Sequence, residues 1–130
     1  MPRLRLPPPV GALVALAVAA ALAGCAHTIR VGASRDLHVA LTEYQLTPET
    51  ARAYAGTLTI TVRNMGTRTH NLAISLGNLN EAQSVDLTPG GTTTMTVDLA
   101  PGKYMLRSTI TGDQSLGLWG SLDVVAIHKA

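Results

Sequence analysis

Short segments of alternating apolar and polar residues recur along the chain and constrain its fold more than any other feature. In the segment 57–63, TLTITVR, the residues Leu58, Ile60 and Val62 fall on one face and threonines fall on the other. A period of two is typical of a half-buried β-strand. Glycine or proline separates most of the segments of this kind, which cover residues 37–48, 57–63, 71–76, 84–87, 92–99, 103–108 and 121–127.

This pattern predicts an all-β fold, an antiparallel Greek-key β-sandwich of seven or eight strands. Residues 49–56 are interpreted as a connector with at most one helical turn, and residues 77–81 as a loop. Roughly 90 ordered residues are enough for one hydrophobic core. Because the chain has no phenylalanine, Leu, Ile, Val, Met and Trp119 must fill that core.

The first 24 residues carry the pattern of a secretory signal. Arg3 and Arg5 precede an apolar run of fourteen residues, 10–23. At about 1.5 Å of rise per residue, a helix of that length falls short of the ~30 Å hydrocarbon core of a bilayer. We therefore expect a signal peptide rather than a membrane-spanning helix.

Cys25 is the single cysteine of the chain and follows Leu22-Ala23-Gly24. This sequence resembles the lipobox of bacterial lipoproteins. The resemblance implies cleavage before Cys25, a diacylglycerol thioether on its sulfur, and acylation of the new amino terminus by a fatty acid such as palmitate. Several acyl chains would then hold the protein on the bacterial cell membrane or envelope, outside the cytoplasm. The alternatives are an ordinary signal peptide with a chance cysteine and an uncleaved anchor.

The predicted organisation is a signal peptide over residues 1–24, a lipidated tether over residues 25–36 and a folded domain over residues 37–130. The chain has 10 Lys and Arg against 8 Asp and Glu. Arg3 and Arg5 leave with the signal, so the mature part carries eight charges of each sign. Because these charges form no basic stripe, we expect no nucleic-acid binding. A single cysteine also excludes an intramolecular disulfide.

An eleven-residue loop, Ser108–Leu118, joins the last two predicted strands, and Ser108, Asp113 and Leu118 stand five residues apart in it. Together with other motifs in the same order along the chain, this loop resembles that of the cupredoxins, the small blue-copper β-sandwich proteins. The other matching motifs are Glu43-Tyr44, Pro48, the strand 57–62, Asn64-x-Gly66, His70-Asn71, Pro89-Gly90 and Pro101-Gly102-x-Tyr104.

A blue-copper centre needs two imidazoles, a thiolate and a distant axial thioether. The resemblance puts the first histidine at His70, the thiolate position at Ser108, the second histidine at Asp113 and the axial methionine at Leu118. Serine has no thiolate, leucine has no donor, and Cys25 lies at the anchor. We therefore expect a degenerate copper site with no cofactor. The alternative is copper, or another metal, held weakly by His70 with Asp113.

The preferred function is that of a non-enzymatic, membrane-anchored module that binds an envelope protein or a small ligand through its loop end. The alternative is a metal-binding or metal-trafficking lipoprotein that uses His70 and a non-standard ligand set. A hydrolase with a triad of Ser108, His70 and Asp113 is disfavoured, because the sequence has no G-x-S-x-G elbow. The simplest interpretation of these three residues is a hydrogen-bonded polar cluster that fills the former metal cavity.

Overall fold

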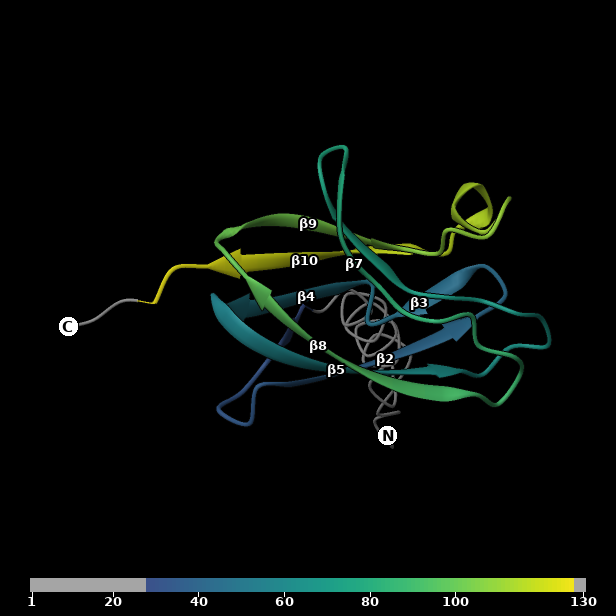
Figure 1. Cartoon of the computed structure of the whole chain (residues 1–130), viewed down its shortest axis with the longest axis horizontal. Helices are drawn as coiled ribbons and strands as arrows, with labels where there is room; N and C mark the ends of the chain where they lie inside the picture. The colour runs from purple at the N-terminus through teal and green to yellow at the C-terminus, as the bar shows by residue number, and fades with distance from the viewer. Residues whose placement is uncertain (1–27, 128–130) are drawn as a thin grey trace, which may run out of the picture.

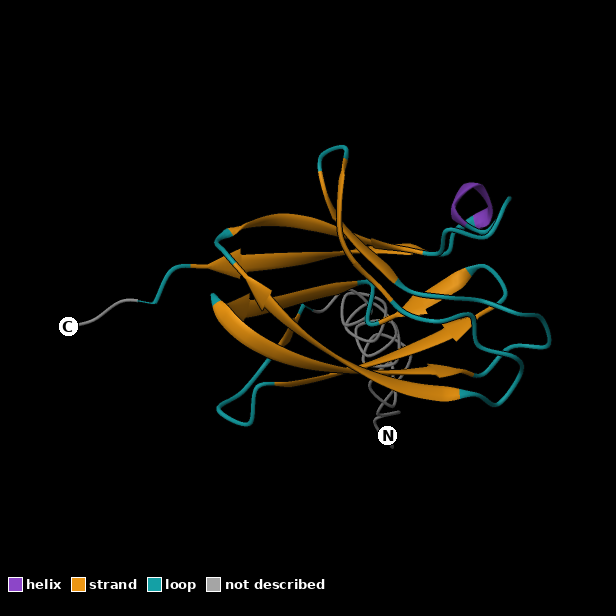
Figure 2. Cartoon of the chain, viewed as in Figure 1, coloured by secondary structure: helices purple, strands orange, loops and turns teal. Residues whose placement is uncertain are grey.

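The computed structural model describes residues 28–127, which form two β-sheets packed face to face (Figures 1 and 2). The signal peptide, Cys25 and the first residues of the predicted tether lie outside the described residues, as does His128. The elements are β1 (Ile29–Arg30), β2 (Asp36–Thr42), β3 (Gln45–Thr47), β4 (Thr50–Tyr54), β5 (Gly56–Asn64), β6 (Ala73–Leu76), β7 (Leu79–Gln83), β8 (Thr92–Leu99), β9 (Gly102–Arg107), the 3-10 helix η1 (Gln114–Leu116) and β10 (Trp119–Val125).

The six-stranded sheet has the order β1-β4-β10-β9-β6-β7, and the four-stranded sheet has the order β3-β2-β5-β8. The predicted β-sandwich is confirmed, but its sheets are mixed rather than purely antiparallel. β2 runs parallel to β5, and β4 runs parallel to β1 and to β10. The chain crosses from one sheet to the other between β3 and β4 and back between β4 and β5. Such crossings allow neighbouring strands to run in the same direction.

Residues 50–54 form the strand β4, so the prediction of a connector with a helical turn was wrong. Ala51 and Ala53 are buried, and they alternate with the exposed Arg52 and Tyr54. β4 pairs with β1 on one side and β10 on the other. Alanine and arginine favour helix locally. Pairing with two neighbouring strands outweighs that preference.

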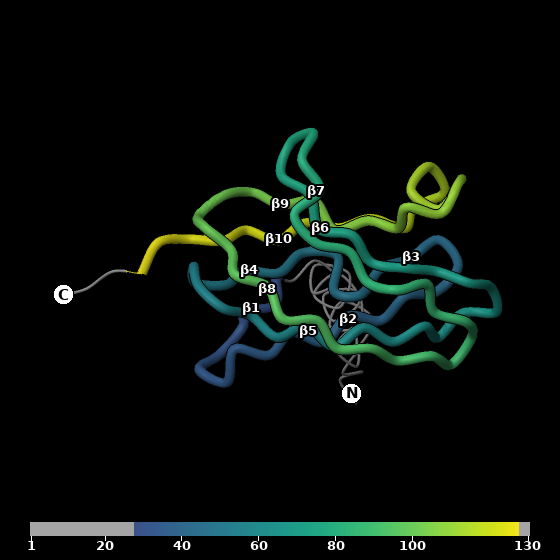
Figure 3. The backbone as a smooth tube through the Cα atoms, in the orientation of Figure 1, coloured from purple at the N-terminus to yellow at the C-terminus, as the bar shows by residue number. Residues whose placement is uncertain are grey.

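The hairpin β6–β7 differs from the sequence prediction in its second half. Residues 79–83, expected to begin in a loop, form the edge strand β7, whose side chains are exposed except for the partly buried Ala82. Residues 84–87, expected to be a strand, form only an isolated bridge between Leu87 and His70. Only Ala82 of this edge strand packs against the core, so the strand has no alternating pattern that could reveal it in the sequence. Figure 3 shows this hairpin projecting away from the sandwich.

The segment predicted as a tether is partly integrated into the sandwich. β1 pairs with β4, and the Val31 amide donates to the Arg52 carbonyl at 2.9 Å. The guanidinium of Arg35 donates to the carbonyls of Tyr54 and Thr57 at 2.8 and 3.0 Å. Among the described residues, the folded domain therefore begins near residue 29 rather than at residue 37. No helix within residues 28–127 has the length and apolarity needed to cross a membrane.

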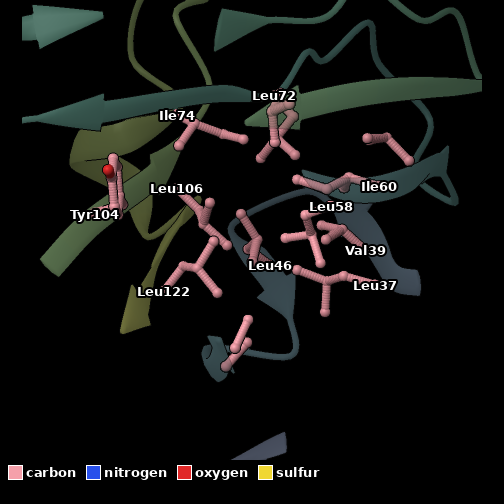
Figure 4. Close-up of a cluster of buried hydrophobic side chains, with 14 of the residues drawn as sticks. Leu37, Val39, Leu46, Leu58, Ile60, Leu72, Ile74, Tyr104, Leu106 and Leu122 are labelled. Carbon is pink, nitrogen blue, oxygen red and sulfur yellow. The ribbon is translucent and has the colours of Figure 1, made fainter. Parts of the chain in front are cut away.

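The core between the sheets is built from branched aliphatic side chains, as the absence of phenylalanine requires (Figure 4). Leu118, at the end of the long loop, is fully buried in it. Trp119 is not a core residue, because 52% of its surface is exposed. The largest fully buried apolar side chains are Val39, Leu41, Leu46, Leu58, Ile60, Val62, Leu72, Ile74, Leu106, Leu118 and Leu122.

Candidate functional site

The loop between β9 and β10 is closed at its base and braced inside. The Ser108 amide donates to the Leu118 carbonyl at 3.4 Å, and the Leu118 amide donates to the Asp113 carbonyl at 3.0 Å. Gly112 and Gly117 have φ angles of 91° and 115°, which glycine adopts without strain. These contacts position the side chains of Ser108 and Asp113 at one end of the sandwich.

Four side chains at this end form one row of hydrogen bonds, which we call the loop-end cluster: Ser108, Asp113, His70 and Glu43. The Ser108 hydroxyl donates to Asp113 Oδ2 at 2.7 Å, and His70 Nδ1 lies 2.7 Å from the same oxygen. His70 Nε2 lies 3.1 Å from Glu43 Oε1. Ser108 and His70 are buried, whereas the side chains of Asp113 and Glu43 are 12% and 24% exposed.

The ring of His70 lies between two carboxyl groups, one at each nitrogen. An ionised carboxylate oxygen can only accept a hydrogen bond. With both carboxyl groups ionised, the two bonds form together when both ring nitrogens carry hydrogen. A histidine that binds a metal must instead offer a nitrogen lone pair. In this structure each nitrogen points at a carboxylate oxygen.

Glu43 is the member of the cluster that the sequence did not identify as a site residue. It lies in the turn between β2 and β3, where Oε1 accepts bonds from the amides of Thr67 and Arg68 at 2.6 and 2.8 Å. Burial raises the pKa of Glu43, but the bonds from the Arg68 amide, the His70 ring and the Thr67 amide outweigh it and lower the pKa from 4.5 to about 2. A Cβ at Gly66 would collide with this carboxylate.

Asn71 is a second residue whose role was not predicted, although the motif His70-Asn71 was part of the resemblance seen in the sequence. Its Oδ1 accepts bonds from the Thr109 amide at 2.8 Å and from the Ser108 hydroxyl at 3.3 Å. Its Nδ2 donates to Thr109 Oγ1 at 2.7 Å and to Asp86 Oδ1 at 2.9 Å. This buried amide therefore joins the start of the long loop to the segments around residues 71 and 86.

The order of groups in the cluster differs from that of a nucleophilic triad. Ser108 and His70 both bond to the same oxygen of Asp113, so the carboxylate stands between the hydroxyl and the imidazole. A triad requires the imidazole to contact the hydroxyl directly and take its proton. The cluster is therefore not arranged for a nucleophilic serine.

The donor set at this end does not fit a type 1 copper ion. Ser108 offers no thiolate, and the buried side chain of Leu118 offers no donor. Glu43 and Asp113 face different nitrogens of His70, so the three groups do not converge on one point. Among residues 28–127, no group of three His, Cys, Asp or Glu side chains is arranged to hold a metal ion.

The methionines and the remaining histidine of the described chain make no hydrogen bond to the cluster. His38 is exposed on β2. Met65 and Met105 were expected to pack in the core but are 61% and 38% exposed, whereas Met95 is partly buried against it. Met105 points outward because it occupies an outward position of β9, between the buried Tyr104 and Leu106.

Comparison with known proteins identifies the family. Residues 12–117 match the family model of the cupredoxin-like domain. Dithionite-reduced auracyanin from the photosynthetic bacterium Roseiflexus castenholzii superposes with a TM-score of 0.65 and 22% identity over 72% of this chain and 99% of that chain. Reduced rusticyanin gives a TM-score of 0.62 and 19% identity over 85% and 95% of the two chains. Rusticyanin from Thiobacillus ferrooxidans superposes with a TM-score of 0.61 and 16% identity over 75% of this chain and 82% of that chain.

No curated protein matches the sequence. At these identities the structural matches show the fold alone, whereas the family model covers well over half of the chain. The β-sandwich, its closing loop and this match agree with the resemblance seen in the sequence, and the chain belongs to the cupredoxin-like domain family.

Proposed function

We propose that this protein is a membrane-anchored envelope lipoprotein whose cupredoxin-like domain has lost its type 1 copper site and serves as a non-enzymatic binding module. The observation that carries the proposal is the environment of His70. Both of its ring nitrogens face carboxylate oxygens, at 2.7 and 3.1 Å. The neighbouring positions Ser108 and Leu118 supply neither a thiolate nor a thioether.

The loop-end cluster supports a binding role because it joins three loops into one surface. Glu43 belongs to the β2–β3 turn, His70 lies in the segment between β5 and β6, and Asp113 belongs to the long loop. Preorganised loops lose little conformational entropy when a partner binds. Large apolar side chains are exposed on these loops, at 49%, 61% and 55% for Tyr44, Met65 and Leu116. Exposed apolar groups of this kind suit a protein partner.

The anchoring part of the proposal rests on the sequence Leu22-Ala23-Gly24-Cys25. Three residues, 26–28, separate Cys25 from β1. At ~3.5 Å per extended residue, they would keep the sandwich within roughly 15 Å of the lipid. Intact-mass analysis of the protein expressed in bacteria is expected to show loss of residues 1–24 and added lipid. Cys25→Ala should prevent both changes, and a wild-type mass without lipid would contradict the anchor.

Copper titration tests the loss of the metal site. The lipid-free mature protein and its His70→Ala variant are titrated with Cu(I) and with Cu(II). We expect no binding tighter than about 1 µM in either protein. Sub-micromolar binding that disappears in His70→Ala would instead support the metal-trafficking alternative. An intense blue colour with Cu(II) would refute the proposed ligand replacements altogether.

A further inference from the structure

A hollow lies on the outer face of the six-stranded sheet, beside the long loop. It shares Ser108 with the loop-end cluster, but the exposed Tyr44, Met65 and Leu116 do not line it. It has a volume of about 470 Å³. Its floor consists of outward side chains of β9 and the start of β10, Met105, Arg107 and Trp119. Loop residues between 108 and 115 form the wall, and its exposed polar residues are Thr109, Thr111, Gln114 and Ser115.

Arg107 is a partly buried cation on this floor. Its Nε donates to Ser75 Oγ at 3.4 Å, which orients the guanidinium along the sheet. Within residues 28–127, the ion pairs are Arg52 with Asp123 and His70 with its two carboxylates, so Arg107 has no carboxylate partner there. A guanidinium is always charged, and a charge removed from water is normally paired. The floor therefore offers a cation suited to a bidentate carboxylate.

Trp119 stands directly opposite Arg107 in the β9–β10 ladder. Side chains at such opposite positions begin about 5 Å apart, so one small ligand reaches both. The indole is 52% exposed and provides a flat apolar surface beside the cation. Gln114 is held over the floor by a contact from its Nε2 to Met105 Sδ at 3.6 Å.

The polar wall narrows the chemistry of the ligand further. Thr109, Thr111 and Ser115 carry hydroxyls that both donate and accept hydrogen bonds. Thr109 Oγ1 accepts a bond from Asn71 Nδ2 but keeps its own proton to donate, and Ser115 Oγ donates to the Gly112 carbonyl but can still accept. A purely apolar acid would cover these groups and the exposed Thr111 without using that remaining capacity, which is unfavourable.

A phosphate chain would call for more cations than the single Arg107 of this cleft. The lining has three parts: the Arg107 cation, the flat indole of Trp119 and the polar loop wall. A ring with one carboxylate, an apolar face and several hydroxyls matches each of them in turn.

We propose that this cleft binds an acidic sugar. In the bound state the carboxylate pairs with Arg107, the apolar face of the sugar ring packs on the indole of Trp119, and the sugar hydroxyls bond to the loop wall. This binding is a function additional to the protein–protein role proposed for the loop-end surface.

Fluorescence provides a direct test, because Trp119 is the only tryptophan of the chain. The mature protein is titrated with D-glucuronate, with D-glucose as the neutral match and with acetate as the carboxylate alone. We expect a saturable change with glucuronate at concentrations up to about 10 mM, and a change at least tenfold weaker with the other two. No response to glucuronate, or an equal response to acetate or glucose, would overturn the proposal.

Variants assign the response to the cleft. Arg107→Gln should weaken glucuronate binding at least tenfold. Arg52→Gln should leave it unchanged, since that arginine lies on the same sheet, outside the cleft, beside Asp123. Thr111→Val changes only an exposed wall residue and should weaken binding several-fold, so the test stands even if Arg107→Gln fails to fold. Unchanged binding in folded Arg107→Gln, or in Thr111→Val, would refute the site.

Discussion

His70 shows how the neighbours of a side chain determine what its polar atoms can do. In a copper site an imidazole gives a lone pair to the metal, whereas here both of its nitrogens face carboxylates. Asp113 serves both His70 and the Ser108 hydroxyl through one oxygen. The cluster satisfies its buried polar atoms internally, and no buried side-chain nitrogen or oxygen among the described residues lacks a partner.

The first prediction at this scale concerns Glu43 and pH. Its pKa in the folded protein is about 2, below the ordinary value of 4.5, so ionisation of Glu43 favours the folded state. This contribution is complete above pH 4.5 and is lost as the pH falls towards 2. Glu43→Gln should therefore lower the melting temperature at neutral pH and flatten its dependence on pH in that window. If the melting temperatures of the wild-type protein and Glu43→Gln fall by the same amount between pH 4.5 and pH 2, this role of Glu43 is contradicted.

The second prediction concerns Asp113. Asp113→Ala removes the partner shared by two buried groups, the His70 ring and the Ser108 hydroxyl. Leaving a buried polar group unsatisfied costs about 1–3 kcal/mol. Urea denaturation should show a loss of unfolding free energy in that range. Asp98→Ala is the matched control, because Asp98 is exposed on β8, and its effect should stay within about 0.5 kcal/mol. Equal effects would show that the cluster adds no stability.

At the scale of elements, the long loop depends on contacts with a distant turn. The β2–β3 turn places Tyr44 in a left-handed conformation, with a φ of 68°, and brings its carbonyl against Gly117. The same turn supplies Glu43 to the cluster. The two elements are far apart in sequence, and their packing determines the shape of the loop end.

A glycine substitution tests this packing. Gly117 has a φ of 115°, and a Cβ there would lie 2.8 Å from the Tyr44 carbonyl oxygen. Gly117→Ala should therefore cost about 2 kcal/mol or more, from backbone strain together with the collision. Gly77→Ala is the control, because Gly77 has a φ of 58° but nothing within 4 Å of its Cβ position. It should cost only about 1 kcal/mol. Chemical denaturation of both variants measures the difference, and equal losses would rule out the steric contribution.

At the scale of the whole molecule, the sandwich brings together segments from both sheets at one end. β2 and β5 belong to the four-stranded sheet and lead towards Glu43 and His70, whereas β9 and β10 belong to the six-stranded sheet and carry the long loop. The frame of a cupredoxin-like domain therefore surrounds the loop-end cluster. Such separation of fold and site is common.

Installing the ligands of a type 1 copper site tests whether that frame supports one. The triple variant Ser108→Cys, Asp113→His and Leu118→Met should bind Cu(II) with the intense blue colour of a thiolate centre, because removing Asp113 also frees one nitrogen of His70. The double variant Asp113→His and Leu118→Met lacks the thiolate and should stay colourless. Absorption spectroscopy distinguishes the two. A folded triple variant that stays colourless with Cu(II) would show that the frame no longer supports the geometry.

Local pattern was sufficient for the elements whose two faces differ. The alternation in 57–63 and 92–99 predicted β5 and β8, because each strand has one face on the core and one in water. The regular spacing in 108–118 likewise indicated a loop that gathers Ser108 and Asp113, and the structure brings these two side chains within hydrogen-bonding distance. The class of fold, the family and the strands with two different faces were thus accessible from the amino acids alone.

Packing across the sandwich decided the rest. β4 is a strand because β1 and β10 pair with it, although its alanines suggest helix. Glu43 meets His70 and the Thr67 and Arg68 amides only after β2 and β5 align, since at least 24 positions along the chain separate Glu43 from them. Hydrogen bonds between segments so distant depend on where the folded chain places each group. No local periodicity records that placement, and for this reason the contact between Glu43 and His70 emerged only from the tertiary structure.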